Sequence, residues 1–199
     1  MNHLRLGRRS VLLYAGLGIA GVGSALALKG LGRNSGASNG AIAPTDALLQ
    51  SAQATSSQSL PEFQGISQWL NSAPLRVANL NGKVVLVQFW TFECINCQRT
   101  LPYIVQWHKK YAAQGLQVIG VHTPEFAFER DVNNVRDALK QHDITYPVPL
   151  DNNFQTWKAY NNRYWPNLYL ADRQGFLRYS HSGEGAYDTT EQTIRRLLG

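Results

Sequence analysis

A strand-like run followed at once by two cysteines is the feature that most restricts the fold of this 199-residue chain. The run Val84-Val85-Leu86-Val87-Gln88-Phe89-Trp90 is almost continuously apolar and rich in β-branched residues, as is typical of a strand buried on both faces. The segment Cys94-Ile95-Asn96-Cys97 comes directly after it and opens a stretch with helical character that stops near Gly115. The sequence therefore predicts a buried strand, a C-x-x-C pair and a helix, in that order.

The rest of the chain supplies the other elements of an α/β domain. We expect strands over residues 75–80 and 116–121, and a hairpin of 167–171 and 176–180. We expect helices over residues 95–114, 131–142, 151–160 and 188–198, the last one capped by Asp188 or Thr189. Parallel strands joined by a helical crossover and followed by an antiparallel hairpin predict a mixed central sheet flanked by helices.

Residues 1–29 have the layout of an export signal or a membrane anchor. Three arginines precede an uncharged run, 11–28, that ends in the A-x-A-like site Ala25-Leu26-Ala27. The pair Arg8-Arg9 with Ser10-Val11-Leu12 loosely resembles a twin-arginine signal. Because the uncharged run is also close to the length of a spanning helix, cleavage and retention both stay open. In either case we expect the body to lie outside the cytoplasm, in the periplasm or on the outer face of the plasma membrane, where disulfides are permitted.

Residues 30–60 are rich in small and polar side chains, which predicts a flexible linker before a folded domain over 61–199. The net charge of +6 comes mostly from the N-terminus, because five of the 19 basic residues precede Asp46, the first acid. The remainder is nearly neutral, so we expect no nucleic-acid partner.

The two cysteines are the chemical centre of the sequence. A helix N-terminus carries unpaired N–H groups and a partial positive charge, which stabilise a thiolate at Cys94. The spacing of three residues places Cys97 one turn away, within reach of a disulfide. Cys94 would attack a substrate disulfide and Cys97 would resolve the mixed disulfide. A structural zinc site normally needs four ligands, and the chain has no second C-x-x-C. We expect no metal, and no cofactor other than the redox-active disulfide.

Several motifs resemble those of the thioredoxin superfamily, in its TlpA-like or redoxin branch. In combination they are similar to the thioredoxin-like domain of DipZ-type cytochrome c biogenesis proteins, over about residues 65–198. Besides the strand and the cysteine pair, these motifs are Trp69-Leu70-Asn71-Ser72, Arg99-Thr100-Leu101-Pro102-Tyr103, His122-Thr123-Pro124-Glu125-Phe126, Asn162-Arg163-Tyr164-Trp165-Pro166 and Gly183-Glu184-Gly185.

The resemblance implies a function and two further site residues. Pro166 matches the cis-proline that faces the cysteine pair and borders the substrate groove. Trp165 would flank that groove, or would simply be a core or surface aromatic. The implied activity is thiol–disulfide exchange with protein thiols and disulfides, with reduction in cytochrome c maturation or disulfide repair as the direction. A single dithiol needs a redox partner, so a membrane electron donor of the CcdA or DsbD type is implied.

Two departures from the thioredoxin pattern bear on mechanism. Gln88 stands where most relatives place a buried acid that relays a proton for the resolving cysteine. Glu125 or Glu93 would have to take over that task, unless water does. Glu93 replaces the usual Trp before Cys94, and a carboxylate there would raise the pKa of the Cys94 thiol, or would merely cap the helix in solvent.

Two other functions compete with the oxidoreductase. A peroxiredoxin-like thiol peroxidase shares the fold, and Thr91 fits its signature, but Val87 stands where that signature has a proline. A peptide-binding assembly factor would use the surface beside Pro166 without needing the cysteines. The intact C-x-x-C pair argues against this third reading.

Overall fold

The computed structural model describes residues 58–199. The expected signal or anchor (1–29), its twin-arginine motif and residues 30–57 of the expected linker lie outside this part. Within residues 58–199, no helix combines the length and the apolar character needed to cross a membrane.

The described residues form a mixed sheet flanked by helices, which confirms the expected fold class. The strands are β1 (Trp69–Leu70), β2 (Val84–Trp90), β3 (Leu116–His122), β4 (Val148–Pro149), β5 (Asn167–Ala171) and β6 (Leu177–Ser182). The helices are α1 (Ile95–Tyr111), α2 (Val132–Gln141), α3 (Gln155–Ala159) and α4 (Tyr187–Leu198).

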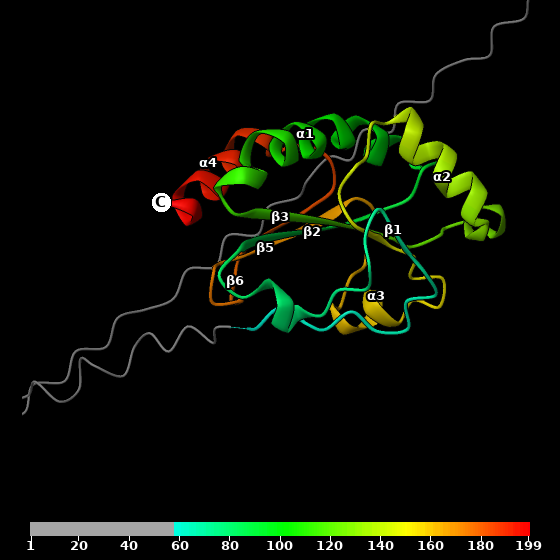
Figure 1. Ribbon diagram of the computed structural model, residues 1–199. Helices are drawn as coiled ribbons and strands as arrows, with labels where there is room; N and C mark the ends of the chain where they lie inside the picture. Colours follow the sequence, from blue (N-terminus) through cyan, green and yellow to red (C-terminus); the bar gives the residue numbers. More distant parts are fainter. Residues whose placement is uncertain (1–57) are drawn as a thin grey trace, which may run out of the picture. The chain divides into compact units, whose positions relative to one another are not determined.

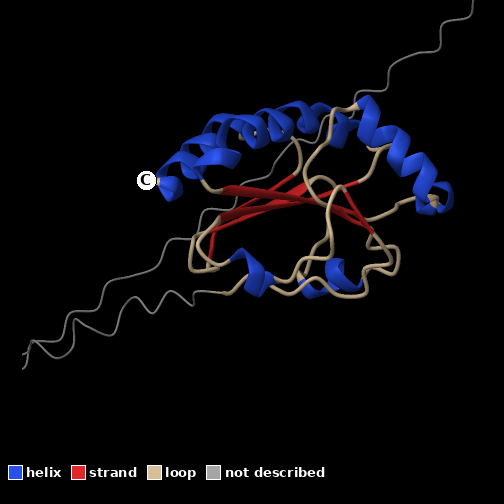
Figure 2. Ribbon diagram, viewed as in Figure 1, coloured by secondary structure: helices blue, strands red, loops and turns tan. Residues whose placement is uncertain are grey.

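The main sheet has the strand order β3-β2-β5-β6, and β1 pairs with β4 in a separate two-stranded sheet. β2 runs parallel to β3 and antiparallel to β5, and β6 is antiparallel to β5. Helices α1, α2 and α4 lie on one face of the main sheet and α3 lies on the other (Figure 1). Figure 2 shows the same two helical layers with the strands between them. A buried strand with helices over both its faces is what the apolar run predicted.

Strand β2 separates two apolar cores, and all seven of its residues are buried. Successive side chains of a strand point to opposite faces. Val84, Leu86 and Trp90 therefore join the core under α1 and α4, whereas Val85, Val87 and Phe89 join the core on the α3 side. By the same alternation Gln88 faces the α1 side, the face on which the active-site helix packs.

Gly120 allows β3 to approach its neighbours closely. A β-carbon at this position would lie 2.8 Å from a ring carbon of Tyr146 and 3.1 Å from Nε1 of Trp90. The same Trp90 Nε1 donates a hydrogen bond to the carbonyl of Gly120, at 3.2 Å. The absence of a side chain at Gly120 thus leaves room for the indole beneath the cysteine pair.

Two segments have a secondary structure that differs from the one predicted from the sequence. The expected strand over 75–80 is wrong, because residues Val77–Leu80 form a 3-10 turn. The Asn79 side chain accepts a hydrogen bond from the Arg76 N–H (3.0 Å), and such local side-chain bonds compete with strand pairing. The expected helix over 151–160 begins only at Gln155, because the Asp151 carboxylate accepts the N–H groups of its first turn.

Both ends of the domain also differ from expectation. The N-cap of α4 is Ala186 in the left-handed region (φ 52°), not Asp188 or Thr189, and no side chain caps the helix. At the other end, the expected linker includes residues 58–60. Leu60 is buried, and its N–H donates to the Gly175 carbonyl at 2.8 Å, while the Leu177 N–H donates to Gln58. These three residues therefore extend the domain toward its N-terminus.

Candidate active site

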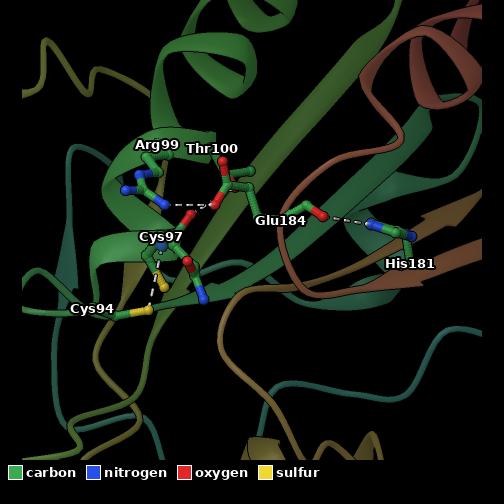
Figure 3. A network of polar contacts seen from close by, with 7 residues as sticks. Cys94, Cys97, Arg99, Thr100, His181 and Glu184 are labelled. Atoms are coloured by element: carbon green, nitrogen blue, oxygen red, sulfur yellow. Dashed lines mark hydrogen bonds and ion pairs between the residues drawn. The ribbon is translucent and has the colours of Figure 1, made fainter. Parts of the chain in front are cut away.

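The two cysteines lie where the chain passes from β2 into α1. Cys94 is the N-cap residue of α1, with extended backbone angles (φ −73°, ψ 110°). Its Sγ accepts a hydrogen bond from the N–H of Cys97, at 3.3 Å (Figure 3). Both cysteines are free thiols. The sulfur thus occupies the position that a Ser or Asp oxygen takes in an ordinary helix N-cap.

The two thiols have opposite acidities. The pKa of Cys94 is lowered to about 7, chiefly by the hydrogen bond from the Cys97 thiol. The backbone N–H groups of Cys97 and Asn96 lower it further, whereas partial burial and the Glu125 carboxylate oppose the change. Cys97 is fully buried, and burial raises the pKa of its thiol, with the hydrogen bond to Cys94 adding to the effect. Near neutral pH, a large fraction of Cys94 is therefore thiolate, whereas Cys97 keeps its proton.

A buried carboxylate holds the loop in front of Cys94. Glu129 has no exposed surface. Its Oε1 accepts the hydroxyl of Thr91 in a very short hydrogen bond and the N–H of Glu93 at 3.2 Å. Its Oε2 accepts the N–H groups of Glu125 (2.6 Å) and Phe126 (2.8 Å). One side chain therefore ties the segment before the cysteines to the loop that follows β3.

His122 lies next to this carboxylate. Its Nε2 is 3.4 Å from the hydroxyl oxygen of Thr91, and its ring stacks on Phe92 with centroids 5.7 Å apart. Burial lowers the pKa of His122 to about 4, although the Glu129 carboxylate opposes the change. The imidazole is therefore neutral at pH 7 and adds no positive charge beside the cysteine pair.

A surface ion pair links the active-site helix to the turn before α4. Arg99 lies 3.4 Å from the Glu184 carboxylate, and both side chains are substantially exposed (Figure 3). Exposed pairs contribute little to stability, typically about 0 to 1 kcal/mol. The pair orients the surface at the start of α1 rather than holding the fold together.

Gln88 and Glu93, two of the residues expected to tune the cysteine pair, lie in different environments. Gln88 is fully buried, and neither its side-chain nitrogen nor its oxygen has a hydrogen-bond partner within residues 58–199. Glu93 is exposed, and only its backbone N–H enters the network. The expectation that Glu93 raises the pKa of Cys94 is wrong in its outcome, because that pKa is lowered and Glu125 is the carboxylate that opposes the shift. The hydrogen bonds to the Cys94 sulfur, first from the Cys97 thiol and then from the backbone N–H groups, outweigh the nearby negative charge.

The predicted substrate-binding residues lie in a second loop. The Trp165–Pro166 peptide bond is cis, as the resemblance implied. Trp165 is half-buried, donates its indole N–H to the Thr123 carbonyl at 3.0 Å and packs against Trp157 with centroids 4.1 Å apart. Trp165 also packs against the same apolar core as Cys94. The part of Trp165 and Pro166 in substrate binding stays a prediction.

Sequence reasoning missed Glu129. An acid was expected at the position of Gln88 or beside Cys94. Glu129 was missed because it lies in a 3-10 turn (Ala127–Arg130), outside any periodic pattern. The available signal was local. A Glu three residues after the loop residue Phe126 fits a carboxylate that accepts backbone N–H groups at the start of a turn.

Comparisons with known proteins agree with this geometry. The family model described as AhpC/TSA family matches residues 57–180. The chain belongs to this family. Protein DipZ of Mycobacterium tuberculosis (strain CDC 1551 / Oshkosh) is 48% identical over 150 residues, which cover 74% of this chain and 22% of DipZ. Thiol-disulfide oxidoreductase YkuV of Bacillus subtilis (strain 168) is 30% identical over 141 residues, which cover 71% of this chain and 95% of YkuV.

The solved structures give the fold. A thioredoxin-like protein determined in its oxidized form matches with a TM-score of 0.66 and 30% identity, covering 72% of this chain and 97% of that one. This match confirms the thioredoxin fold and, with DipZ and YkuV, the expected superfamily. Over nearly the whole length of YkuV, the chain is therefore similar to a protein named as a thiol–disulfide oxidoreductase. The chain spans only about a fifth of the length of DipZ, the first relative it matches.

The unequal thiols predict a pH profile for alkylation. We expect iodoacetamide to modify Cys94 alone, at a rate that rises with pH through a midpoint near 7 and then levels off, because only the thiolate reacts. Mass spectrometry of the alkylated chain measures this rate. The same chain in urea should show a midpoint near about 8.5, the value of a free thiol. A folded-state midpoint at 8.5 or above would contradict the account.

The Glu129 contacts predict a stability effect. In Glu129→Gln the amide nitrogen cannot accept, so two of the four buried donors lose their partner. We expect the free energy of unfolding in urea to fall by about 2 to 4 kcal/mol. Glu125→Gln is the control, because its side chain is exposed, and it should change stability by less than about 0.5 kcal/mol. Equal stability of the two variants would show that the buried network contributes nothing.

Proposed function

We propose that this chain is an extracytoplasmic reductant of protein disulfides, with Cys94 as nucleophile and Cys97 as resolving thiol. One observation carries the direction of electron flow, namely the pKa of Cys94 at about 7. A more stable thiolate favours the reduced form and makes a dithiol a stronger oxidant. The pKa of the nucleophile is about 7 in thioredoxin and about 3.5 in the strongly oxidising DsbA. The pKa of Cys94 therefore matches that of thioredoxin, the more reducing of these two proteins.

The reaction needs only the two sulfurs. The Cys94 thiolate attacks one sulfur of the substrate disulfide, the substrate S–S bond breaks, and a mixed disulfide and a substrate thiolate form. Cys97 then loses its proton and its sulfur attacks Sγ of Cys94, which releases the second substrate thiolate. The two released thiolates take up protons according to their own pKa values. Two electrons pass to the substrate, and the Cys94–Cys97 disulfide remains.

The structure gives a reason why Cys97 reacts only at the second step. In the free dithiol, the hydrogen bond to Cys94 and the negative charge on Cys94 both raise the pKa of Cys97. Once Cys94 is in a mixed disulfide, it carries no charge, and the Cys97 thiol no longer serves it as a donor. The pKa of Cys97 therefore falls when its thiolate is needed. Gln88 cannot accept the proton, so water or a carboxylate must.

The role in the cell follows from the leader and the family resemblance. The N-terminal arginines and the uncharged run support export, and the DipZ-type motifs support cytochrome c maturation or disulfide repair. The Cys94–Cys97 disulfide must be reduced again after each turnover, which supports a membrane electron donor of the CcdA or DsbD type. Protein thiols and disulfides are the substrates.

Particular residues of the chain argue against each of the two competing functions. A peroxidase would require the peroxiredoxin signature, in which a proline stands at the position of Val87. An assembly factor without redox chemistry has no need of a half-buried thiolate paired with a buried thiol.

Variants of the cysteines test the assigned roles. The reduced full chain should release two thionitrobenzoate anions from dithionitrobenzoate and end with an internal disulfide. Cys97→Ser should release one anion and keep the other as a covalent adduct, because the serine cannot resolve it. Absorbance gives the released anion and mass spectrometry gives the adduct. Cys94→Ser should react at least about a hundredfold more slowly, because Cys97 is buried and protonated.

Three outcomes would contradict the proposal. Equal reaction of Cys94→Ser and Cys97→Ser would reverse or abolish the assigned roles. A stable adduct on the wild-type chain would mean that Cys97 does not resolve. Faster oxidation of the reduced chain by hydrogen peroxide than by a peptide disulfide would favour the peroxidase.

A further inference from the structure

A groove beside the cysteine pair is not used by the chemistry described above. It lies between the start of α1 and helix α2 and has a volume of about 390 Å³. The side chains that define it are Phe92, Glu93, Gln98, Phe128, Asp137 and His142. We call it the Phe128 groove. Phe92, Glu93 and Gln98 line it, so the groove lies against the chain on both sides of the cysteine pair in the sequence.

Exposed aromatic rings form one side of the Phe128 groove. Phe128 is 51% exposed and Phe126 is 49% exposed. Their rings stack with centroids 5.8 Å apart and planes 3° apart, and Phe92 contacts Phe128 at 6.0 Å. The Glu129 hydrogen bond to the Phe126 N–H fixes the backbone of this segment. Clustered exposed apolar side chains of this size mark interaction surfaces.

The charges of the Phe128 groove have one sign. Glu93 and Asp137 line it, and none of its lining residues within 58–199 is a Lys or an Arg. Lys140 pairs with Asp137 at 3.0 Å, but both side chains are about three-quarters exposed, so a competing cation can displace this pair. Burial lowers the pKa of His142, which leaves its imidazole neutral near pH 7. The groove therefore presents an aromatic side and two carboxylates, of which Asp137 has only an exposed, displaceable ion pair.

The position of the groove identifies what occupies it. A partner protein must bring a sulfur onto Cys94 to form the mixed disulfide, and the residues next to that partner cysteine then lie over the surface around Cys94. We propose that the Phe128 groove binds those residues and selects a segment with an apolar side chain against Phe128 and a Lys or Arg near Glu93 and Asp137. This inference rests on the proposed function and names the class of substrate segment for the same site.

Two symmetric peptide disulfides test the selection. One is the disulfide-linked dimer of Gly-Leu-Cys-Lys-Gly and the other is that of Gly-Ser-Cys-Glu-Gly. The reduced full chain is mixed with each dimer, and the released peptide thiol is measured by acid quench and chromatography. Because flanking charge also changes the leaving-group acidity, each rate is divided by the rate with dithiothreitol. We expect the Leu/Lys dimer to react at least about tenfold faster on this corrected scale.

Variants locate the selection in the groove. In the double variant Phe128→Ser with Asp137→Asn, the ratio of the two corrected rates should fall at least about fivefold. Phe128→Leu keeps an apolar side chain and should retain most of this ratio. Asp143→Asn, an exposed carboxylate outside the groove, is the matched control and should keep the full preference. Equal corrected rates for the two dimers, or a preference that survives the double variant, would overturn the inference.

Hydroxyethyl disulfide separates this inference from the proposed function. If the chain is oxidised by hydroxyethyl disulfide but does not distinguish the two dimers, the groove inference is wrong and the oxidoreductase stands. If neither hydroxyethyl disulfide nor either dimer oxidises the chain, the proposed function itself is wrong, and the groove inference falls with it.

Discussion

The hydrogen bonds that Cys97 donates to the sulfur of Cys94, chiefly from its thiol and also from its N–H, are the contacts on which the chemistry of this protein depends. The bond from the N–H is 3.3 Å long. It makes the sulfur the cap of α1, so the unpaired N–H groups of the helix favour negative charge there. The buried strand β2 delivers the chain to this point, and the first turn of α1 carries Cys97 into the core. One strand-to-helix junction therefore produces an acidic, accessible thiol and an inert, buried thiol three residues apart.

Glu129 gives that junction its shape. A buried carboxylate is costly unless its lone pairs are satisfied, and four donors from two loops satisfy this one. Three of the donors are backbone N–H groups, so the side chain fixes the backbone just before the cysteine pair and in the loop that follows β3. The same side chain holds the backbone N–H of Phe126, whose exposed ring stacks on that of Phe128. The chemistry at Cys94 and the surface that surrounds it thus share a single support.

The sequence predicted what depends on local pattern. The apolar run of β2, the cysteine pair at a helix start and the mixed sheet follow from residue types and spacing. The 3-10 turn at Val77–Leu80 was missed because its apolar residues resemble a strand, whereas the side chains of Asn79 and Glu62 accept backbone N–H groups at its start. Glu129 was missed because its role depends on two loops that meet only in the folded chain. The direction of the Cys94 pKa shift depends on a balance between the hydrogen bonds from Cys97, partial burial and a nearby carboxylate, which sequence spacing does not supply.

The reduction potential of the Cys94–Cys97 pair decides whether this pair is a reducing dithiol. The full chain would be equilibrated in glutathione or dithiothreitol buffers of defined ratio, quenched with acid, alkylated and analysed by mass spectrometry. Cys97→Ser, which cannot form the internal disulfide, is the control. The account predicts a reversible two-electron couple below about −220 mV. A potential near about −120 mV, or no reversible Cys94–Cys97 disulfide, would contradict it.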